Sequence, residues 1–220
     1  VMTINGTVTK TFLSLCLVVI SGYYSWINIS ITNVLILPAI FVALILGGVT
    51  IYKKHLSPIT VPIYAVIQGI FLGAISYTFN SLYDGIVITA ISYTLSILFV
   101  MLTLYRTGII KPTENFKLGV AAGTGGIALI YLANFVMSFF GTGLSIMDIN
   151  NASMYSIGFS LLVIVMASLN LVVDFDFIEE GSEKRAPKYM EWYGAFGLLV
   201  TLIWLYLEIL RLLAKMNSRK

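Results

Sequence analysis

Charged residues are what this sequence has least of. Only 10% of its 220 residues are Asp, Glu, Lys or Arg, whereas 59% are hydrophobic. A soluble globular protein usually carries about 25% charged residues. So large an apolar fraction exceeds what one soluble core of this size can bury, and we therefore expect a lipid bilayer around the chain. The net charge of +3 is too small and too scattered to indicate a nucleic-acid-binding protein.

Residues that carry chemistry are also scarce. Cys16 is the only cysteine, which excludes an intramolecular disulfide and makes redox chemistry improbable. His55 is the only histidine and has no His or Cys partner at metal-ligand spacing. The segment "GTGG" lacks the Lys-Ser/Thr ending of a phosphate-binding loop, and no Ser/His/Asp set is present. The sequence therefore predicts neither an enzyme nor a bound cofactor.

Long apolar runs occupy most of the chain. A helix needs roughly 20 apolar residues to cross the hydrocarbon of a membrane. Seven such runs are expected at residues 9–27, 33–52, 58–79, 85–105, 116–140, 153–178 and 188–215. The linkers between them are too short to hold a soluble domain, so we predict one all-α integral membrane domain over residues 1–220.

Basic residues indicate how the spans are oriented. If the spans alternate, one side of the membrane carries Lys10, Lys53, Lys54, Arg106, Lys111, Lys117, Lys184, Arg185 and Lys188. The three opposing loops contain no Lys or Arg, so the positive-inside rule predicts a cytoplasmic N-terminus. The C-terminus conflicts with this rule, since Arg211, Lys215, Arg219 and Lys220 would lie outside. Either these charges are tolerated there, or the last segment does not cross completely.

Glycines at four-residue spacing predict close helix packing. Gly69 and Gly73 form one such pair, and Gly119 and Gly123 form another. In lipid, small residues at this spacing let two helix backbones approach each other. This pattern favours bundling of the helices over a ligand-binding role.

Two aspartates stand near the end of the sixth run. Residues two apart point about 200° apart on a helix, so Asp174 and Asp176 cannot share a face. Asp176 faces the acidic end of the run, which indicates contact with water. Asp174 continues a small and polar stripe through Ser156, Ser160, Val163, Ala167 and Asn170. Acids inside a membrane span usually face the bundle interior or a wet cavity, which favours a functional role for Asp174 over a structural salt bridge.

Acidic residues of the last run could pair with Asp174. A hairpin centred near Glu183 places Asp174 opposite Trp192 to Ala195, within a turn of Glu191. Two close carboxylates in a low dielectric resist double ionisation, so such a pair holds one proton more tightly than an isolated acid does. Alternatively, Glu191 ends a helix beside Lys188.

Another stripe of the last helix joins Thr201 and Glu208, because seven residues nearly complete two turns. Arg211 follows Glu208 at i+3 and could neutralise it.

The third run, "PIYAVIQGIFLGAIS", and the C-terminal segments "SLNLVVDFDFIEEG" and "APKYMEWYGAFGLLVTLIWLYLEILRLLAKM" carry a family resemblance. Together with the seven spans, they resemble the Bax inhibitor-1 / transmembrane Bax inhibitor motif family, and within it the bacterial YccA-like branch. The resemblance implies a central last helix wrapped by two three-helix groups. It also implies a calcium leak in the bacterial plasma membrane, gated by protonation of an aspartate pair from the sixth and seventh helices.

Asp174 matches the sixth-helix acid of that pair. Alignment on "LLR" places Thr201 at the seventh-helix position, whereas alignment on "LYL" places Glu208 there. A basic latch is also implied, for which Lys53 and Lys54 are on the correct side. We expect a pH-sensitive calcium leak, with Asp174 and Glu191 as the candidate calcium ligands. The alternatives are a membrane partner of a quality-control protease or of a stress or cell-death pathway, and a proton-coupled transporter.

Overall fold

The computed structural model describes residues 1–219, and this part of the chain contains helices and no β-strand. Seven helical segments are long and apolar enough to cross a membrane. They are Ile4–Ile27, Ile29–Tyr52, Lys54–Leu82, Ile86–Arg106, Glu114–Ser138, Met154–Glu183 and Met190–Asn217. The predicted all-α integral membrane protein with seven spans is therefore confirmed.

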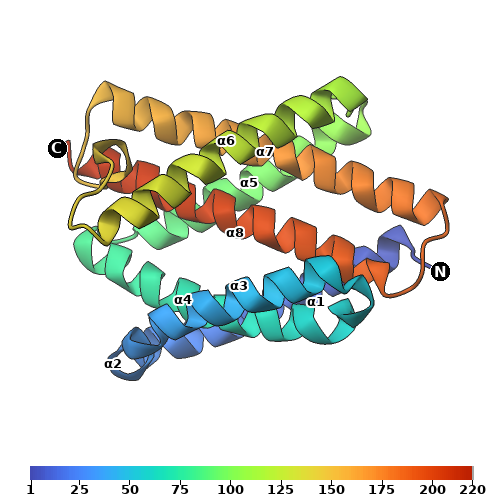
Figure 1. Cartoon of the computed structure of the whole chain (residues 1–220), viewed down its shortest axis with the longest axis horizontal. Coiled ribbons are helices and arrows are strands. Elements are labelled where there is room, and N and C mark those ends of the chain that lie inside the picture. Colours follow the sequence, from blue (N-terminus) through green and yellow to red (C-terminus); the bar gives the residue numbers. More distant parts are fainter. Residues whose placement is uncertain (220) are drawn as a thin grey trace. The chain divides into compact units, whose positions relative to one another are not determined.

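The helices follow one another along the chain (Figure 1), and the longest connection, residues 139–153 between α6 and α7, contains a 3-10 turn. They are α1 (Ile4–Ile27), α2 (Ile29–Thr32), α3 (Ile36–Tyr52), α4 (Ser57–Leu82), α5 (Ile86–Arg106), α6 (Glu114–Ser138), α7 (Met154–Glu183) and α8 (Met190–Asn217). Three short 3-10 turns are η1 (Asn33–Leu35), η2 (Lys54–Leu56) and η3 (Ser145–Met147). Most bounds lie within a few residues of the prediction.

Two helix ends differ from the expected positions for local reasons. Helix α1 begins five residues early because the Thr3 hydroxyl accepts a hydrogen bond of 3.0 Å from the Gly6 N–H and caps the helix. Helix α7 continues through the acidic segment to Glu183. It stops where Arg185 adopts a left-handed backbone with φ of 51°, a conformation common just past helix ends.

The chain divides into two compact units. Unit 1 comprises Val1–Leu82 and Asp176–Val200, and unit 2 comprises Tyr83–Phe175 and the chain from Thr201 onward. Helices α7 and α8 therefore each have one part in each unit. The side-chain contacts described below lie within one unit or the other.

In unit 1, helices α1 and α4 pack backbone against backbone. A Cβ atom added to Gly73 would lie 2.2 Å from the carbonyl oxygen of Gly22, closer than real contacts allow. The Ser25 hydroxyl donates a hydrogen bond of 2.8 Å to the carbonyl oxygen of Ile70, which also joins the two helices. The close packing predicted from Gly69 and Gly73 is therefore confirmed.

In unit 2, the predicted stripe of α7 faces inward. Ser156, Ser160, Val163 and Ala167 have no exposed surface. Next along the stripe, the Asn170 amide donates a hydrogen bond of 2.7 Å to the Thr124 hydroxyl of α6. Nearby, Gly123 packs against the Met166 side chain, whereas Gly119 faces open space. Of the second glycine pair, only Gly123 serves close packing.

Helix α8 has the largest buried share of the seven spans. Within its most apolar window 56% of the residues are buried, compared with 50% for Lys54–Leu82 and at most 33% for the other five. High burial is what a central helix requires. The wrapping of α8 by two three-helix groups stays a prediction.

Candidate functional site

The carboxylate of Asp174 on α7 is bound by a hydroxyl of α8. Thr201 Oγ1 donates a hydrogen bond of 2.6 Å to Asp174 Oδ2, within unit 2. Among residues 1–219, this hydroxyl is the only group that donates to Asp174, and no Lys, Arg or His lies within salt-bridge distance of it. The sixth-helix acid therefore has one neutral partner.

The expected register of the hairpin between α7 and α8 is wrong. Asp174 lies at the level of Thr201 and not opposite Trp192 to Ala195, because α7 runs on to Glu183 and α8 begins only at Met190. The centre of the hairpin is thus a few residues later than expected. Glu191 precedes Thr201 by about ten residues, which corresponds to about 15 Å along α8.

Glu191 has cationic partners in unit 1. Its side chain is fully buried, with Oε2 lying 2.7 Å from Lys10 Nζ and Oε1 lying 3.2 Å from Lys188 Nζ. Oε1 also accepts hydrogen bonds from the backbone N–H and the hydroxyl of Thr3, at 3.0 and 2.9 Å. The expectation that Glu191 pairs with Asp174 is replaced by the alternative, a helix-end carboxylate beside Lys188. Glu191 ties the start of α1 to the start of α8.

The structure does not show the expected difference in exposure between Asp174 and Asp176. Both residues are half-buried in the structure. The opposite faces predicted from the 200° rotation are consistent with the inward position of Asp174 beside Thr201. Contact of Asp176 with water stays a prediction.

Glu208 is the centre of a second polar cluster on α8. Its Oε2 accepts a hydrogen bond of 2.8 Å from the Tyr131 hydroxyl of α6 and lies 2.7 Å from Arg211 Nη1. Trp204 Nε1 donates to the same tyrosine hydroxyl at 3.2 Å. Glu208 is only 1% exposed, so Arg211 neutralises a buried charge, as the i+3 spacing predicted.

Lys215 is a functional candidate that the sequence analysis missed. It is fully buried, although it was expected among late charges outside the membrane. Its Nζ donates to the carbonyl oxygens of Ile146 and Ser156, at 2.8 and 3.1 Å, and to the Ser160 hydroxyl at 2.9 Å. The signal was present: Lys215 continues the stripe of Thr201 and Glu208 by the same step of seven residues.

These contacts set the register of the two helices in unit 2. Asp174 of α7 meets Thr201 of α8. Fourteen residues earlier in α7 and fourteen residues later in α8, Ser160 meets Lys215. The polar faces of α7 and α8 therefore stay in register over about 21 Å. One end of this shared face carries a carboxylate, and the other end carries an ammonium group.

The two latch candidates Lys53 and Lys54 lie exposed in unit 1. The Nζ atom of Lys54 lies 5.0 Å from the ring centre of Tyr193, at cation–π distance. A latch on Asp174 stays a prediction.

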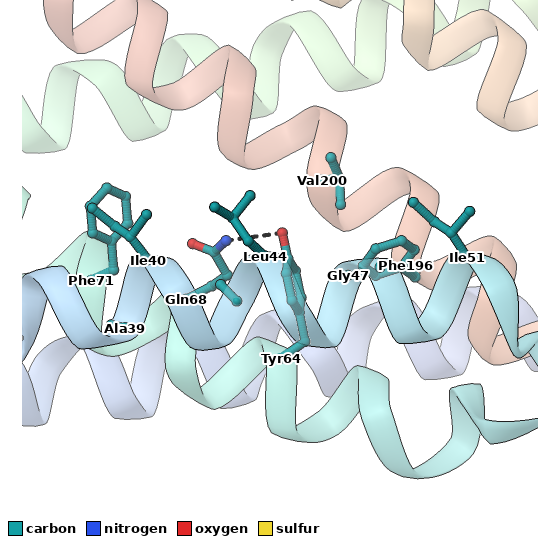
Figure 2. A pocket seen from close by; sticks show the side chains of 12 residues that line it. Ala39, Ile40, Leu44, Gly47, Ile51, Tyr64, Gln68, Phe71, Phe196 and Val200 are labelled. Atoms are coloured by element: carbon teal, nitrogen blue, oxygen red, sulfur yellow. Dashed lines mark hydrogen bonds between the residues drawn. The ribbon is translucent and has the colours of Figure 1, made fainter. Parts of the chain in front are cut away.

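Unit 1 contains a cavity of about 410 Å³ between α3, α4 and α8 (Figure 2). Its lining is mostly apolar, and the polar side chains in it are those of Tyr64 and Gln68. The Gln68 amide donates to the Tyr64 hydroxyl at 2.9 Å, while Phe196 of α8 meets the Tyr64 ring edge-on. No carboxylate lines this cavity, so it offers a cation no charged ligand.

Calcium was expected at Asp174 and Glu191. Within residues 1–219, no three His, Cys, Asp or Glu side chains form a group that could hold a metal ion. The carboxylates of Asp174, Glu191 and Glu208 instead each bind different protein groups. In the described part of the chain, these carboxylates therefore lie singly and do not form a metal centre with several carboxylate ligands.

Comparison with known proteins covers nearly the whole chain. A family model described as Bax inhibitor 1 like matches residues 1–218. None of the curated proteins matches the chain. The matched range includes all seven spans and the polar residues of α7 and α8 described above.

Proposed function

The chain belongs to the Bax inhibitor 1 like family, and on that premise we propose that it is a pH-sensitive calcium leak with Asp174 as the proton-sensing group. Calcium is the transported ion in this proposal and not a cofactor. We place the protein in a bacterial plasma membrane with a cytoplasmic N-terminus.

The observation that carries the proposal is the single neutral partner of Asp174. An acid inside a membrane span is expensive and is by default a functional candidate. A salt bridge favours the charged form of a carboxylate, and Asp174 lacks one, whereas Glu208 has Arg211 at 2.7 Å. Thr201 supplies one hydrogen bond and no charge. Gain of a proton at Asp174 therefore changes the net charge at this point by a full unit.

Protonation of Asp174 would also change the link between α7 and α8. The ionised carboxylate can only accept a hydrogen bond from Thr201, whereas a protonated carboxyl group can donate one. The ionised form attracts a passing cation and the neutral form does not. Charge and helix contact would thus change together, which is what a proton-operated gate needs.

The test uses the purified full chain in liposomes with a calcium indicator inside. We expect calcium entry above that of empty liposomes and a rate that varies with pH. Asp174→Asn should fix the charge at this position and flatten the pH profile. Asp176→Asn, two residues away on the same helix, is the matched control and should leave the profile nearly unchanged.

Two results would contradict the proposal in different ways. If Asp174→Asn keeps the wild-type flux and pH profile, the aspartate is structural and the sensor lies elsewhere. If the wild-type chain gives no flux above empty liposomes, the leak itself is wrong. The expected alternative, a membrane protein that acts by binding a protease or a stress-pathway partner, would then be favoured.

A further inference from the structure

The ammonium group of Lys215 is unusual in having three neutral oxygen partners. A buried lysine is normally paired with a carboxylate, because taking its charge out of water is expensive. Here the three N–H donors meet the carbonyl oxygens of Ile146 and Ser156 and the hydroxyl oxygen of Ser160. Lysine has three such donors, so all of them are used.

The three oxygens, which we call the oxygen cage, come from separate parts of unit 2. Ile146 lies in η3, in the loop between α6 and α7, whereas Ser156 and Ser160 lie in the first turns of α7. Asp148 in the same loop accepts hydrogen bonds from Asn150 instead of from Lys215. Among the described residues, no carboxylate forms a salt bridge with Lys215.

Neutral carbonyl and hydroxyl oxygens in this arrangement replace the hydration shell of a monovalent cation, as carbonyl rings do in ion-selective pores. We infer that the oxygen cage of Ile146, Ser156 and Ser160 is a binding site for a small monovalent cation, which the tethered Lys215 ammonium group fills. Removal of the lysine head group takes one donor from each of the three oxygens, although the Ile146 carbonyl keeps the Ser156 hydroxyl as a donor at 3.1 Å. A potassium or methylammonium ion supplies the missing charge and the missing contacts.

The cage also has a consequence for the polar face that α7 and α8 share. Lys215 fixes a positive charge at the end opposite Asp174, about 21 Å along the helices. This charge repels cations from that end and acts as a built-in plug. The role of Lys215 as a plug rests on the proposed leak, whereas the cation-binding site does not.

The decisive experiment is chemical rescue of Lys215→Ala. Its thermal unfolding midpoint is measured in detergent with methylammonium chloride, potassium chloride or choline chloride at equal ionic strength. At a concentration a hundredfold above Kd, methylammonium or potassium should raise the midpoint by roughly 5–10 °C relative to choline, which is too large for the cage. The wild-type chain and Lys111→Ala, which removes an exposed lysine, should respond equally to all three salts.

A second pair of variants keeps the test valid if Lys215→Ala does not fold. Lys215→Met retains most of the apolar stem and should show the same rescue. Adding Ser160→Ala removes one oxygen of the cage, so rescue of the double variant should need roughly tenfold more cation. Equal effects of all three salts on Lys215→Met and on the wild type, or equal rescue with and without Ser160, would overturn the binding site.

The plug is tested separately by calcium flux into liposomes. In choline chloride, whose cation is too large to refill the cage, Lys215→Met should raise the flux several-fold, and Lys111→Met should not. If the wild type and Lys215→Met both show no flux while salt rescue is observed, only the proposed leak fails. If Lys215→Met leaks calcium no faster than the wild type, Lys215 is not a plug.

Discussion

Thr201 and Asp174 join α8 to α7 through a hydrogen bond of 2.6 Å from the threonine hydroxyl to the carboxylate. The contact lies within unit 2 and fixes the register of the two helices. Of the two alignments of the last helix, the one on "LLR" puts Thr201 at the position of the second acid, and Thr201 does lie beside Asp174. Glu208, the position from the other alignment, binds Tyr131 and Arg211 instead.

Loss of the Thr201 hydroxyl should destabilise the protein. Thr201→Val keeps the shape of the side chain but leaves the Asp174 carboxylate without its donor. An unsatisfied acceptor costs about 1–3 kcal/mol when it is fully buried, and Asp174 is half-buried, so the loss should lie near the lower end of that range. Chemical denaturation in detergent measures the change, and Thr201→Ser, which keeps a hydroxyl, should restore most of the loss. Equal stability of the valine and serine variants would show that the hydrogen bond contributes nothing.

The Glu208–Arg211 pair should behave as a coupled unit. Arg211→Met leaves a carboxylate that is 1% exposed without its cation and should cost about 3 kcal/mol. Adding Glu208→Gln removes the uncompensated charge and should recover most of that loss. A double-mutant cycle in urea or guanidinium measures the coupling.

The Glu114–Lys117 pair, whose glutamate is exposed and whose lysine is half-buried, is the control for this cycle, because it has the same i,i+3 spacing. Its glutamate side chain is 87% exposed, so Lys117→Met should change stability by less than about 1 kcal/mol. Additive effects at Glu208 and Arg211 would show that the buried pair is not coupled.

Two glycine substitutions should have opposite effects on stability. Gly73→Ala places a Cβ atom 2.2 Å from the Gly22 carbonyl oxygen, so α1 and α4 must move apart, at a cost of about 1–3 kcal/mol. Gly125→Ala on α6 meets no atom within 4 Å. It should stabilise the protein by about 0.5–1 kcal/mol, because alanine restricts the unfolded chain and favours a helix. Thermal unfolding of both variants checks the difference, and a tolerated Gly73→Ala would disprove the close contact.

The proposed orientation can be tested with single cysteines. Cys16 is the only native cysteine, so Cys16→Ser gives a background without reactive thiols. In that background, cysteines at positions 53 and 185 should react with an impermeant reagent from the cytoplasmic side only. A cysteine at position 150, in the loop between α6 and α7, should react from the other side. Labelling of positions 53 and 185 from opposite sides would rule out the alternating topology.

Features that depend on neighbours along one helix could be predicted from the sequence. The spans follow from apolar length, the inward stripe of α7 from helical spacing, and the Glu208–Arg211 pair from the i+3 step. The glycine contact of α1 with α4 was also indicated, because small residues at four-residue spacing suit close packing whatever the partner helix is. These features depend on composition and on the fixed 3.6-residue period of the helix.

The partners of the buried charges were decided only by the tertiary structure. The hairpin turn lies a few residues later than expected, so Asp174 accepts a hydrogen bond from Thr201. Glu191 instead pairs with Lys10 and Lys188. The partners of Lys215 lie 55 to 69 residues away in the chain, and two of them are backbone carbonyls, which every residue type has. Helical periodicity tells which face of a helix a side chain is on. Which oxygen meets a buried charge depends on the exact register between helices, because a shift of one turn moves each residue by about 5.4 Å and replaces its partner.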